Sequence, residues 1–262
     1  SGADIILVTV KSGATTEIAE LIAREATPGA VVVSLQNGVG NADLLRERLP
    51  GFDVRAGMVP FNVVQMGERH FHRGTSGDVV VEAGEGDLGQ ALSVPYLAVG
   101  ESGDMGPVLW GKLLLNLNNA LNALSGLTLY EQLSSRVWRG LIADQMDESL
   151  IVLRAAGIIP AKATPLPPAM VPGILRLPTP LFRLISGRML KIDRTARSSM
   201  WEDLERGRKT EIGVLQGAVE DLAETHGLKV PLITRVTNLI RDAERAGAGS
   251  PGLVPESVRA DG

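Results

Sequence analysis

Two runs of consecutive aliphatic residues near the start of the chain constrain its fold most strongly. Residues 5–10 read Ile-Ile-Leu-Val-Thr-Val and residues 31–35 read Val-Val-Val-Ser-Leu, a continuous apolar pattern typical of strands buried on both faces. Residues 15–26 between them show helical spacing, and Pro28-Gly29 ends that helix. This strand, helix and second strand, joined by short links, predict a parallel βαβ unit with a right-handed crossover.

The rest of the chain divides into short strands followed by long helices. We expect brief strands, arranged as an antiparallel meander at the sheet edge, over residues 54–59, 62–66, 70–73 and 78–82. From about Pro107 a 3.6-residue period predicts helices over residues 108–124, 136–156, 201–226 (one helix, or two with a break near Gly207) and 232–245. The polar, glycine-rich segment 100–106 marks the expected boundary. We therefore expect an α/β domain over 1–104, an all-α domain over 105–246 that the proline-rich segment 165–180 covers, and a frayed tail over 247–262.

The composition excludes several classes of protein. The chain has no cysteine and only 3 histidines, which excludes thiolate chemistry and argues against a bound metal. A net charge of -4 and 3% aromatic residues give no basic or stacking surface for nucleic acid. We find neither a membrane-spanning apolar segment nor a signal peptide, and so expect a cytoplasmic protein without membrane or nucleic-acid partners.

Residues 84–89, Gly-Glu-Gly-Asp-Leu-Gly, match the spacing of a dinucleotide-binding loop. Such a loop presents backbone N–H groups to phosphates, whereas Glu85 and Asp87 would place two carboxylates beside them. The segment that follows is also too short for a helix and a second strand. We interpret this match as an ordinary loop, and we interpret His70 and His72 as surface residues of one strand.

Lys112, Asn116 and Asn119 form a polar stripe, because residues at i, i+4 and i+7 share one face of a helix. The stripe is either a solvated helix face or the wall of a polar pocket. Asparagine is a poor helix former, which favours the pocket. An ammonium group in such a pocket can act as a proton donor.

Further polar residues lie where ligands commonly bind. Lys11 and Gln36-Asn37-Gly38 follow the two buried strands, whose carboxyl ends form the usual ligand edge of a parallel sheet. Ser198-Ser199 opens a helix, either as an ordinary N-cap or as a site for a substrate carboxylate. Glu211, in the expected first turn of another helix that begins at Lys209, is either a plain first-turn anion or an orienting carboxylate for Lys112.

Taken in order, these segments resemble the ketopantoate reductase family. The resemblance extends over roughly residues 3–245, and it rests on the order and spacing of several motifs. The matching landmarks are Val8-Thr9-Val10-Lys11, Leu35-Gln36-Asn37-Gly38-Val39-Gly40, Gly57 with Asn62, Trp110-Gly111-Lys112-Leu113 with Asn116, and Ser198-Ser199-Met200 with Glu211. The resemblance implies a Rossmann-like α/β N-terminal domain and an all-α C-terminal domain.

It also implies an activity: the NADPH-dependent reduction of a 2-keto acid, 2-dehydropantoate to (R)-pantoate, on the route to pantothenate and coenzyme A. By position, Lys112 would donate the proton to the ketone oxygen, while Asn116 and Ser199 would bind the substrate hydroxyl and carboxylate. The other implied contacts are Asn37 to both substrate and cofactor, Asn119 to the substrate, and Lys11, Val63 and Glu211 to the NADP cofactor.

The chain departs from the family pattern in three places, one of which is Ser12-Gly13-Ala14, where the family often has a glutamine soon after the Lys11 position. Members begin with a strand and a glycine-rich phosphate loop, so we expect the Rossmann-like domain here to be N-terminally incomplete. A second asparagine is expected eight residues after the lysine, where Ala120 stands and Asn119 is its neighbour. Two alternatives therefore stay open: a reductase of another small 2-oxo acid, and a catalytically silent module for binding or dimerisation. The apolar helical domain is consistent with a homodimer.

Overall fold

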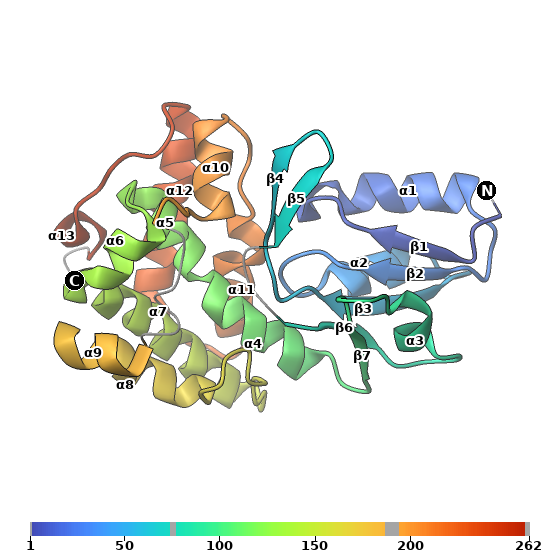
Figure 1. Cartoon of the computed structure of the whole chain (residues 1–262), viewed down its shortest axis with the longest axis horizontal. Coiled ribbons are helices and arrows are strands. Elements are labelled where there is room, and N and C mark those ends of the chain that lie inside the picture. Colours follow the sequence, from blue (N-terminus) through green and yellow to red (C-terminus); the bar gives the residue numbers. More distant parts are fainter. Residues whose placement is uncertain (1, 74–76, 187–193, 260–262) are drawn as a thin grey trace. The chain divides into compact units, whose positions relative to one another are not determined.

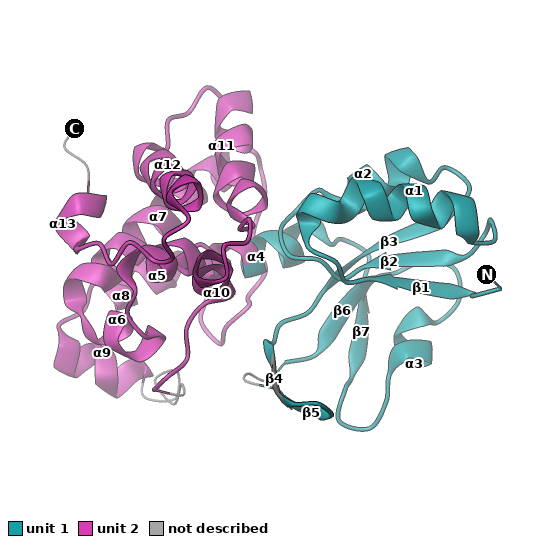
Figure 2. Ribbon diagram, turned by 90° about the horizontal axis from the view of Figure 1, so that it is seen from above, with its two compact units in different colours: residues 1–112 teal, residues 113–262 magenta. Residues whose placement is uncertain are grey.

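The structure, a computed structural model, describes residues 2–73, 77–186 and 194–259 (Figure 1). The chain divides into two compact units, residues 1–112 and 113–262 (Figure 2). The division falls inside helix α4 (Gly106–Asn116), later in the chain than the boundary predicted after residue 104.

The first unit is an α/β unit built on a five-stranded mixed sheet with the strand order β1-β2-β3-β6-β7. Strands β1, β2 and β3 are parallel to each other, β6 is antiparallel to β3, and β7 is parallel to β6. The elements are β1 (Ile5–Val8), α1 (Thr15–Glu25), β2 (Val31–Ser34), α2 (Asn41–Arg48), β3 (Asp53–Met58), β4 (Val63–Gly67), β5 (His70–Arg73), β6 (Val79–Glu82), α3 (Leu88–Leu92) and β7 (Val99–Ser102).

Alternate side chains of the strands enter two separate cores, one on each face of this sheet. Val8, Val32 and Val54 pack with the apolar face of α1 and α2, whereas Val33 and Val81 pack with α3 on the opposite face. Figure 2 shows α1 and α2 on one side of the sheet and α3 on the other. Coverage of both faces explains why the first two strands are apolar without interruption, and it confirms the predicted βαβ unit.

The predicted antiparallel meander is wrong, although all four of its strands exist. Strand β3 continues the parallel sheet, and β4 pairs only with β5 in a separate two-stranded sheet. Strand β6 then returns to pair with β3. Strand β7 (Val99–Ser102) was not predicted. Residue patterns locate strands, but pairing partners depend on long-range packing that local periodicity does not encode.

In the described residues of the second unit, all regular secondary structure is helical, and loops join the helices. Its helices are α5 (Asn118–Ser125), α6 (Leu129–Ser134), α7 (Arg136–Ala155), α8 (Val171–Leu175), α9 (Thr179–Ser186), α10 (Ser199–Glu205), α11 (Gln216–Thr225), α12 (Pro231–Ala246) and α13 (Pro255–Val258). The long helix α7 lies against α5, α6, α8, α11, α12 and α13. Its buried face, which includes Leu141, Met146 and Leu153, forms the centre of the apolar core.

Two of the predicted long helices are interrupted. The segment 108–124 breaks at Leu117, whose carbonyl accepts a hydrogen bond from Gln216 Nε2 at 2.9 Å, a side-chain insertion of the kind that kinks helices. Segment 201–226 breaks after Glu205, and Gly207 takes a left-handed φ of 59°. No helix begins at Lys209: a short 3-10 turn covers Ile212–Val214 and α11 starts at Gln216.

Two covering segments of this unit are well packed. Arg139 of α7 is fully buried and donates to the carbonyls of Leu175 and Leu177, which ties down the proline-rich segment as predicted. The predicted frayed tail is wrong within the described residues. Leu253 N donates to Leu124 O at 2.8 Å, and Val258 of α13 is fully buried. The last three residues of that tail, 260–262, lie outside the described residues.

Candidate functional site

The carboxyl ends of β1 and β2 carry the polar residues that the sequence singled out. Lys11 is exposed in the link between β1 and α1, and Asn37 is half-buried in the loop between β2 and α2. Gly38 and Gly40 in this second loop have φ values of 86° and 85°, a conformation that favours glycine. The loop therefore reverses sharply just after Asn37 and leads into the N-terminus of α2.

Lys112 reaches this loop from α4. Its ammonium nitrogen Nζ donates to Asn37 Oδ1 at 3.1 Å and to the backbone carbonyl of Val59. The side chain is half-buried, while Trp110, Leu113 and Leu114 on other faces of the helix are buried. Both acceptors are neutral oxygen atoms, so neither of them cancels the positive charge of the ammonium.

The remaining predicted substrate residues, Asn116, Asn119 and Ser199, lie in the second unit. Asn116 and Asn119 are half-buried, whereas Ala120 is completely buried in the apolar core. Ser199 is exposed at the first position of α10, directly after its N-cap residue Ser198. The Ser198 hydroxyl accepts from Trp201 N at 3.1 Å and donates to Asn119 O at 3.0 Å. Two predicted substrate residues, Asn119 and Ser199, are thereby held close together.

Two predicted cofactor residues remain: Glu211 belongs to the second unit and Val63 to the first. Glu211 is half-buried and precedes the 3-10 turn, where its carbonyl accepts from Val214 N and Leu215 N. Val63 is the first residue of β4, pairs with Arg73 and is 53% exposed. The accessible position of Val63 on an edge strand is compatible with the backbone role that the family resemblance implies.

The loop 84–89 with dinucleotide-like spacing serves the protein's own packing. The backbone N–H of Gly89 donates to Glu101 Oε1 at 2.7 Å, and Asp87 caps α3 by accepting from Gln90 N at 2.9 Å. A Cβ atom on Gly89 would lie 2.9 Å from the Val99 carbonyl oxygen. The interpretation as an ordinary loop is confirmed, but the expectation that no helix and strand could follow is wrong, since α3 and β7 do so.

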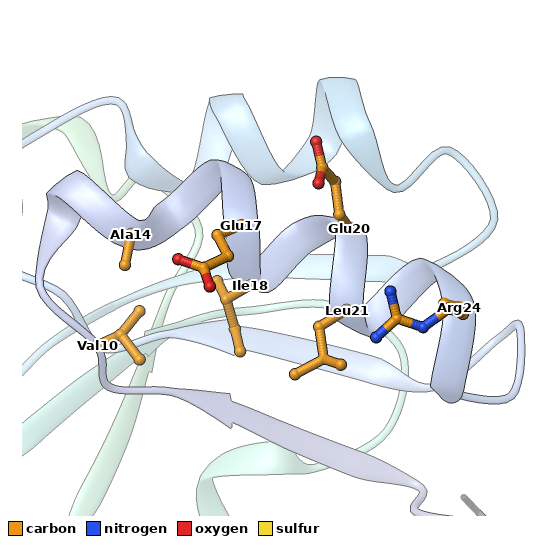
Figure 3. Close-up of a pocket in the computed structure, with 7 residues that line it drawn as sticks. All are labelled: Val10, Ala14, Glu17, Ile18, Glu20, Leu21 and Arg24. Atoms are coloured by element: carbon orange, nitrogen blue, oxygen red, sulfur yellow. The ribbon is translucent and has the colours of Figure 1, made fainter.

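A surface pocket lies beside α1 (Figure 3). Glu17, Glu20 and Arg24 contribute its charged groups, and the other lining residues are Val10, Ala14, Ile18 and Leu21. None of the candidate catalytic or binding residues lines it. We therefore assign it no part in the chemistry of the site.

Two further features of the described residues concern metal ions and membranes. No group of three or more histidine, aspartate or glutamate side chains there is arranged to hold a metal ion, and His70 and His72 are exposed on β5. Nor does the described part of the chain contain a helix with the length and apolar character needed to cross a membrane.

Sequence reasoning missed three groups that shape the site. The Val59 carbonyl is a backbone group, so no side-chain pattern reveals it. Asn41, 8% exposed at the start of α2, and Asn122, completely buried in α5, are polar residues inside packed elements. A buried asparagine needs hydrogen-bond partners. The one sequence signal for both residues was an asparagine inside a segment predicted to pack in the core.

The residues at the ends of β1 and β2 fit a nicotinamide dinucleotide. Added Cβ atoms on Gly13 and Gly40, near the starts of α1 and α2, would meet nothing within 4 Å, so there is open space beside both glycines. Lys11 and Asn37 add an ammonium and an amide beside them. This donor set suits the ribose, phosphate and carboxamide groups of such a cofactor.

Comparison with known families identifies the chain. Its residues 104–244 match the family model described as the C-terminal part of ketopantoate reductase PanE/ApbA, and residues 1–86 match the model of ketopantoate reductase PanE/ApbA. With its Rossmann-like first unit and helical second unit, the chain belongs to the ketopantoate reductase family. This family is one of oxidoreductases.

Individual relatives agree with this assignment. The 2-dehydropantoate 2-reductase of Halobacterium salinarum is 25% identical over 253 residues, which cover 94% of this chain and 77% of that protein. The enzyme of the same name from Archaeoglobus fulgidus is 26% identical over 253 residues, covering 92% and 77%. A PanE/ApbA family ketopantoate reductase from Ralstonia eutropha has a similar crystal structure, with a TM-score of 0.79, 29% identity and coverage of 94% and 78%.

Proposed function

We propose that the protein is an NADPH-dependent reductase of a small 2-keto acid, with 2-dehydropantoate as the substrate and (R)-pantoate as the product. The observation that carries this proposal is the position of Lys112, whose ammonium lies against Asn37 at the carboxyl end of the parallel sheet. That edge is where ligands bind in sheets of this kind. Family membership and the names of two relatives support the choice of reaction and substrate.

In this proposal the cofactor is held by Asn37, Lys11, the backbone at Val63 and Glu211. When bound, the reduced nicotinamide supplies a hydride equivalent to the carbonyl carbon of the substrate. Lys112 stabilises the negative charge that grows on the ketone oxygen and donates a proton to it. The bonds to Asn37 Oδ1 and Val59 O hold the ammonium of Lys112 at the carboxyl end of the sheet.

Substrate binding is assigned to the second unit and the end of α4. The Ser199 hydroxyl, exposed at the start of α10, donates to the substrate carboxylate, and Asn116 binds the substrate hydroxyl. Asn119 contributes an additional amide. The family pattern has a polar asparagine at position 120, where this chain has the fully buried Ala120. Because that polar group is missing, other 2-oxo acids are the second candidate substrates.

The proposal extends to the setting of the activity. We place it in the cytoplasm, in the supply of pantoate for pantothenate and coenzyme A, and in a homodimer. A fold relative from Staphylococcus aureus, 17% identical with a TM-score of 0.70, is described as a dimeric ketopantoate reductase. Size-exclusion chromatography of the purified protein with light scattering tests the proposed homodimer, for which we expect the mass of two chains.

A steady-state screen of the full-length protein tests the proposed function. The panel contains 2-dehydropantoate and several smaller, larger and aromatic 2-oxo acids, each with NADPH and with NADH. We expect the highest kcat/KM for 2-dehydropantoate with NADPH. A better turnover of another 2-oxo acid would favour the second candidate. Failure of every acid to oxidise either cofactor, together with unchanged NADPH fluorescence on mixing, would support the catalytically silent module instead.

A further inference from the structure

A chain of buried polar side chains in the first unit ends on the residue that holds Lys112. The backbone carbonyl of Asn37 accepts from Asn41 Nδ2 at 2.7 Å and from the Ser12 hydroxyl at 3.1 Å. Asn41 is the first residue of α2 and only 8% exposed. Its amide is therefore committed to the loop that carries Asn37 and is not available to solvent.

The other end of the Asn41 amide is held from α1 and β2. Thr15, which is completely buried, donates from Oγ1 toward Asn41 Oδ1 at 3.2 Å and toward the carbonyl of Ser12 at 2.8 Å. The same Thr15 oxygen accepts from Gln36 Nε2 at 2.8 Å. Because both ends of the Asn41 amide have fixed partners, its Nδ2 group is directed at the Asn37 carbonyl.

These contacts compensate for the loop's lack of regular structure. Residues 36–39 belong to no strand or helix, and Gly38 and the following Gly40 have positive φ values. Such a loop holds one conformation only when surrounding groups determine it. Of the two bonds to the Asn37 carbonyl named above, the one from Asn41 is the shorter.

We propose that Asn41 is a positioning residue for the reductase reaction: it fixes the backbone of Asn37 so that Asn37 Oδ1 aligns the ammonium of Lys112. This inference rests on the proposed function, in which Lys112 is the proton donor. The second acceptor of Lys112, the Val59 carbonyl, lies after β3 and is independent of Asn41. Removing the Asn41 amide should leave Lys112 bonded to the Val59 carbonyl, but its ammonium should no longer be aligned by Asn37 Oδ1.

A pair of substitutions with matched controls tests this role. Asn41→Asp keeps the acceptor for Thr15 and the size of the side chain, but it removes the N–H donor to Asn37 O. We expect kcat for the 2-keto acid to fall about 10- to 100-fold, with KM for the acid within about threefold of the wild type. The exposed Asn238, on α12 of the second unit, provides the control Asn238→Asp, for which we expect both constants to be unchanged.

Thr15 provides a second, milder test in case Asn41→Asp folds poorly. Thr15→Val removes the hydroxyl at nearly constant volume and should lower kcat, whereas Thr15→Ser keeps the hydroxyl and should retain it. A purely structural role predicts a different result: reduced thermal stability in Asn41→Asp and Thr15→Val with kcat per folded molecule unchanged. That result would overturn the proposal.

A measurement without turnover separates this inference from the proposed function. The rate of reductive methylation of the Lys112 amine, followed by mass spectrometry of its peptide, reports how firmly the ammonium is held. We expect faster modification in Asn41→Asp than in the wild type and in Asn238→Asp. Equal rates in all three proteins would contradict the positioning role even if the wild type proves inactive on every 2-oxo acid, which would contradict only the proposed reaction.

Discussion

At the scale of single residues, the site depends on which polar side chains already make hydrogen bonds within the protein. Lys112 makes hydrogen bonds to Asn37 Oδ1 and Val59 O, which orient its ammonium group. Ser198 and Ser199 show the same principle at the start of α10. The first is 4% exposed and uses its hydroxyl in two internal hydrogen bonds, while the second is exposed. Adjacent serines are therefore expected to have different roles.

The two serines give a paired prediction. Ser199→Ala should raise KM for the 2-keto acid about tenfold or more, because a hydrogen bond to a charged carboxylate is lost, with little change in stability. Ser198→Ala should lower the free energy of unfolding by about 1–2 kcal/mol, because an N-cap is lost. Steady-state kinetics and urea unfolding of both variants check this. An unchanged KM in Ser199→Ala would remove its assigned role.

Much of the site could be predicted at this scale, but only for its side chains. Lys112 and Asn37 stand out because they are polar residues beside apolar runs, and the structure brings them together. The Val59 carbonyl could not be predicted, since every residue has a backbone carbonyl and only the fold selects one. The roles of Asn41 and Asn122 depend on burial, which their immediate sequence neighbours do not determine.

At the scale of elements, Asn122 joins α5 to the start of α10. Its Oδ1 accepts from Ser198 N at 2.8 Å, and its Nδ2 donates to Leu127 O at 3.0 Å. The residue is completely buried, so removing the amide would leave a backbone donor and a backbone acceptor without partners. Through Ser198, this asparagine also determines where Ser199 stands on α10.

We predict that Asn122→Ala lowers the free energy of unfolding by about 2–4 kcal/mol, because two buried backbone groups lose their hydrogen bonds. Guanidinium unfolding followed by tryptophan fluorescence measures this, since Trp201 lies on α10. Asn238→Ala on the exposed face of α12 serves as the control. A loss in Asn122→Ala no greater than in the control would show that the α5–α10 connection carries little energy.

Element boundaries were harder to predict than elements. Helix α7 matches its predicted range closely, because a regular apolar period defines it along its whole length. The break at Leu117 has no local signal, since it comes with a hydrogen bond from the distant Gln216. Beyond Gly207, the Thr210 backbone N–H bonds to Glu244 and the Thr210 hydroxyl accepts from Ile212 N, and such side-chain bonds compete with helix formation.

At the scale of the whole molecule, a buried carboxylate gives stability a specific pH dependence. Glu148 of α7 accepts from the backbone N–H groups of Leu232 and Ile233, both at 3.0 Å, at the start of α12. Burial raises the pKa of Glu148 above its ordinary value, although these two bonds oppose the effect. A carboxyl group with a raised pKa in the folded state stabilises the fold below its unfolded pKa, and this contribution declines as pH rises through the folded pKa.

Glu148→Gln should remove that dependence. The difference in unfolding free energy between wild type and Glu148→Gln is expected to be largest at about pH 4 and to shrink toward about pH 7. Because an amide stays neutral over this range, the variant itself should show no pH dependence from position 148. Urea unfolding at several pH values gives both results, and a difference that grows with pH would contradict the assignment.

The fold class was the most predictable property at this scale. Uninterrupted apolar strands require coverage on both faces, which leads directly to an α/β unit, and long amphipathic segments lead to the helical unit. The order of strands β3, β6 and β7 could not be predicted, because it depends on which edges meet after the chain leaves the sheet at β4 and β5. The two units are consistent with the two family models that match the chain.

The central claim is that the ammonium of Lys112 donates the proton in reduction of a 2-keto acid. Its most direct test is kcat for 2-dehydropantoate with NADPH in Lys112→Ala, beside Lys229→Ala in the exposed link before α12 as the control. The account predicts a fall in kcat of about 100- to 10,000-fold in the first variant and none in the second, with NADPH still bound by both. A Lys112→Ala protein that turns over at the wild-type rate would contradict it.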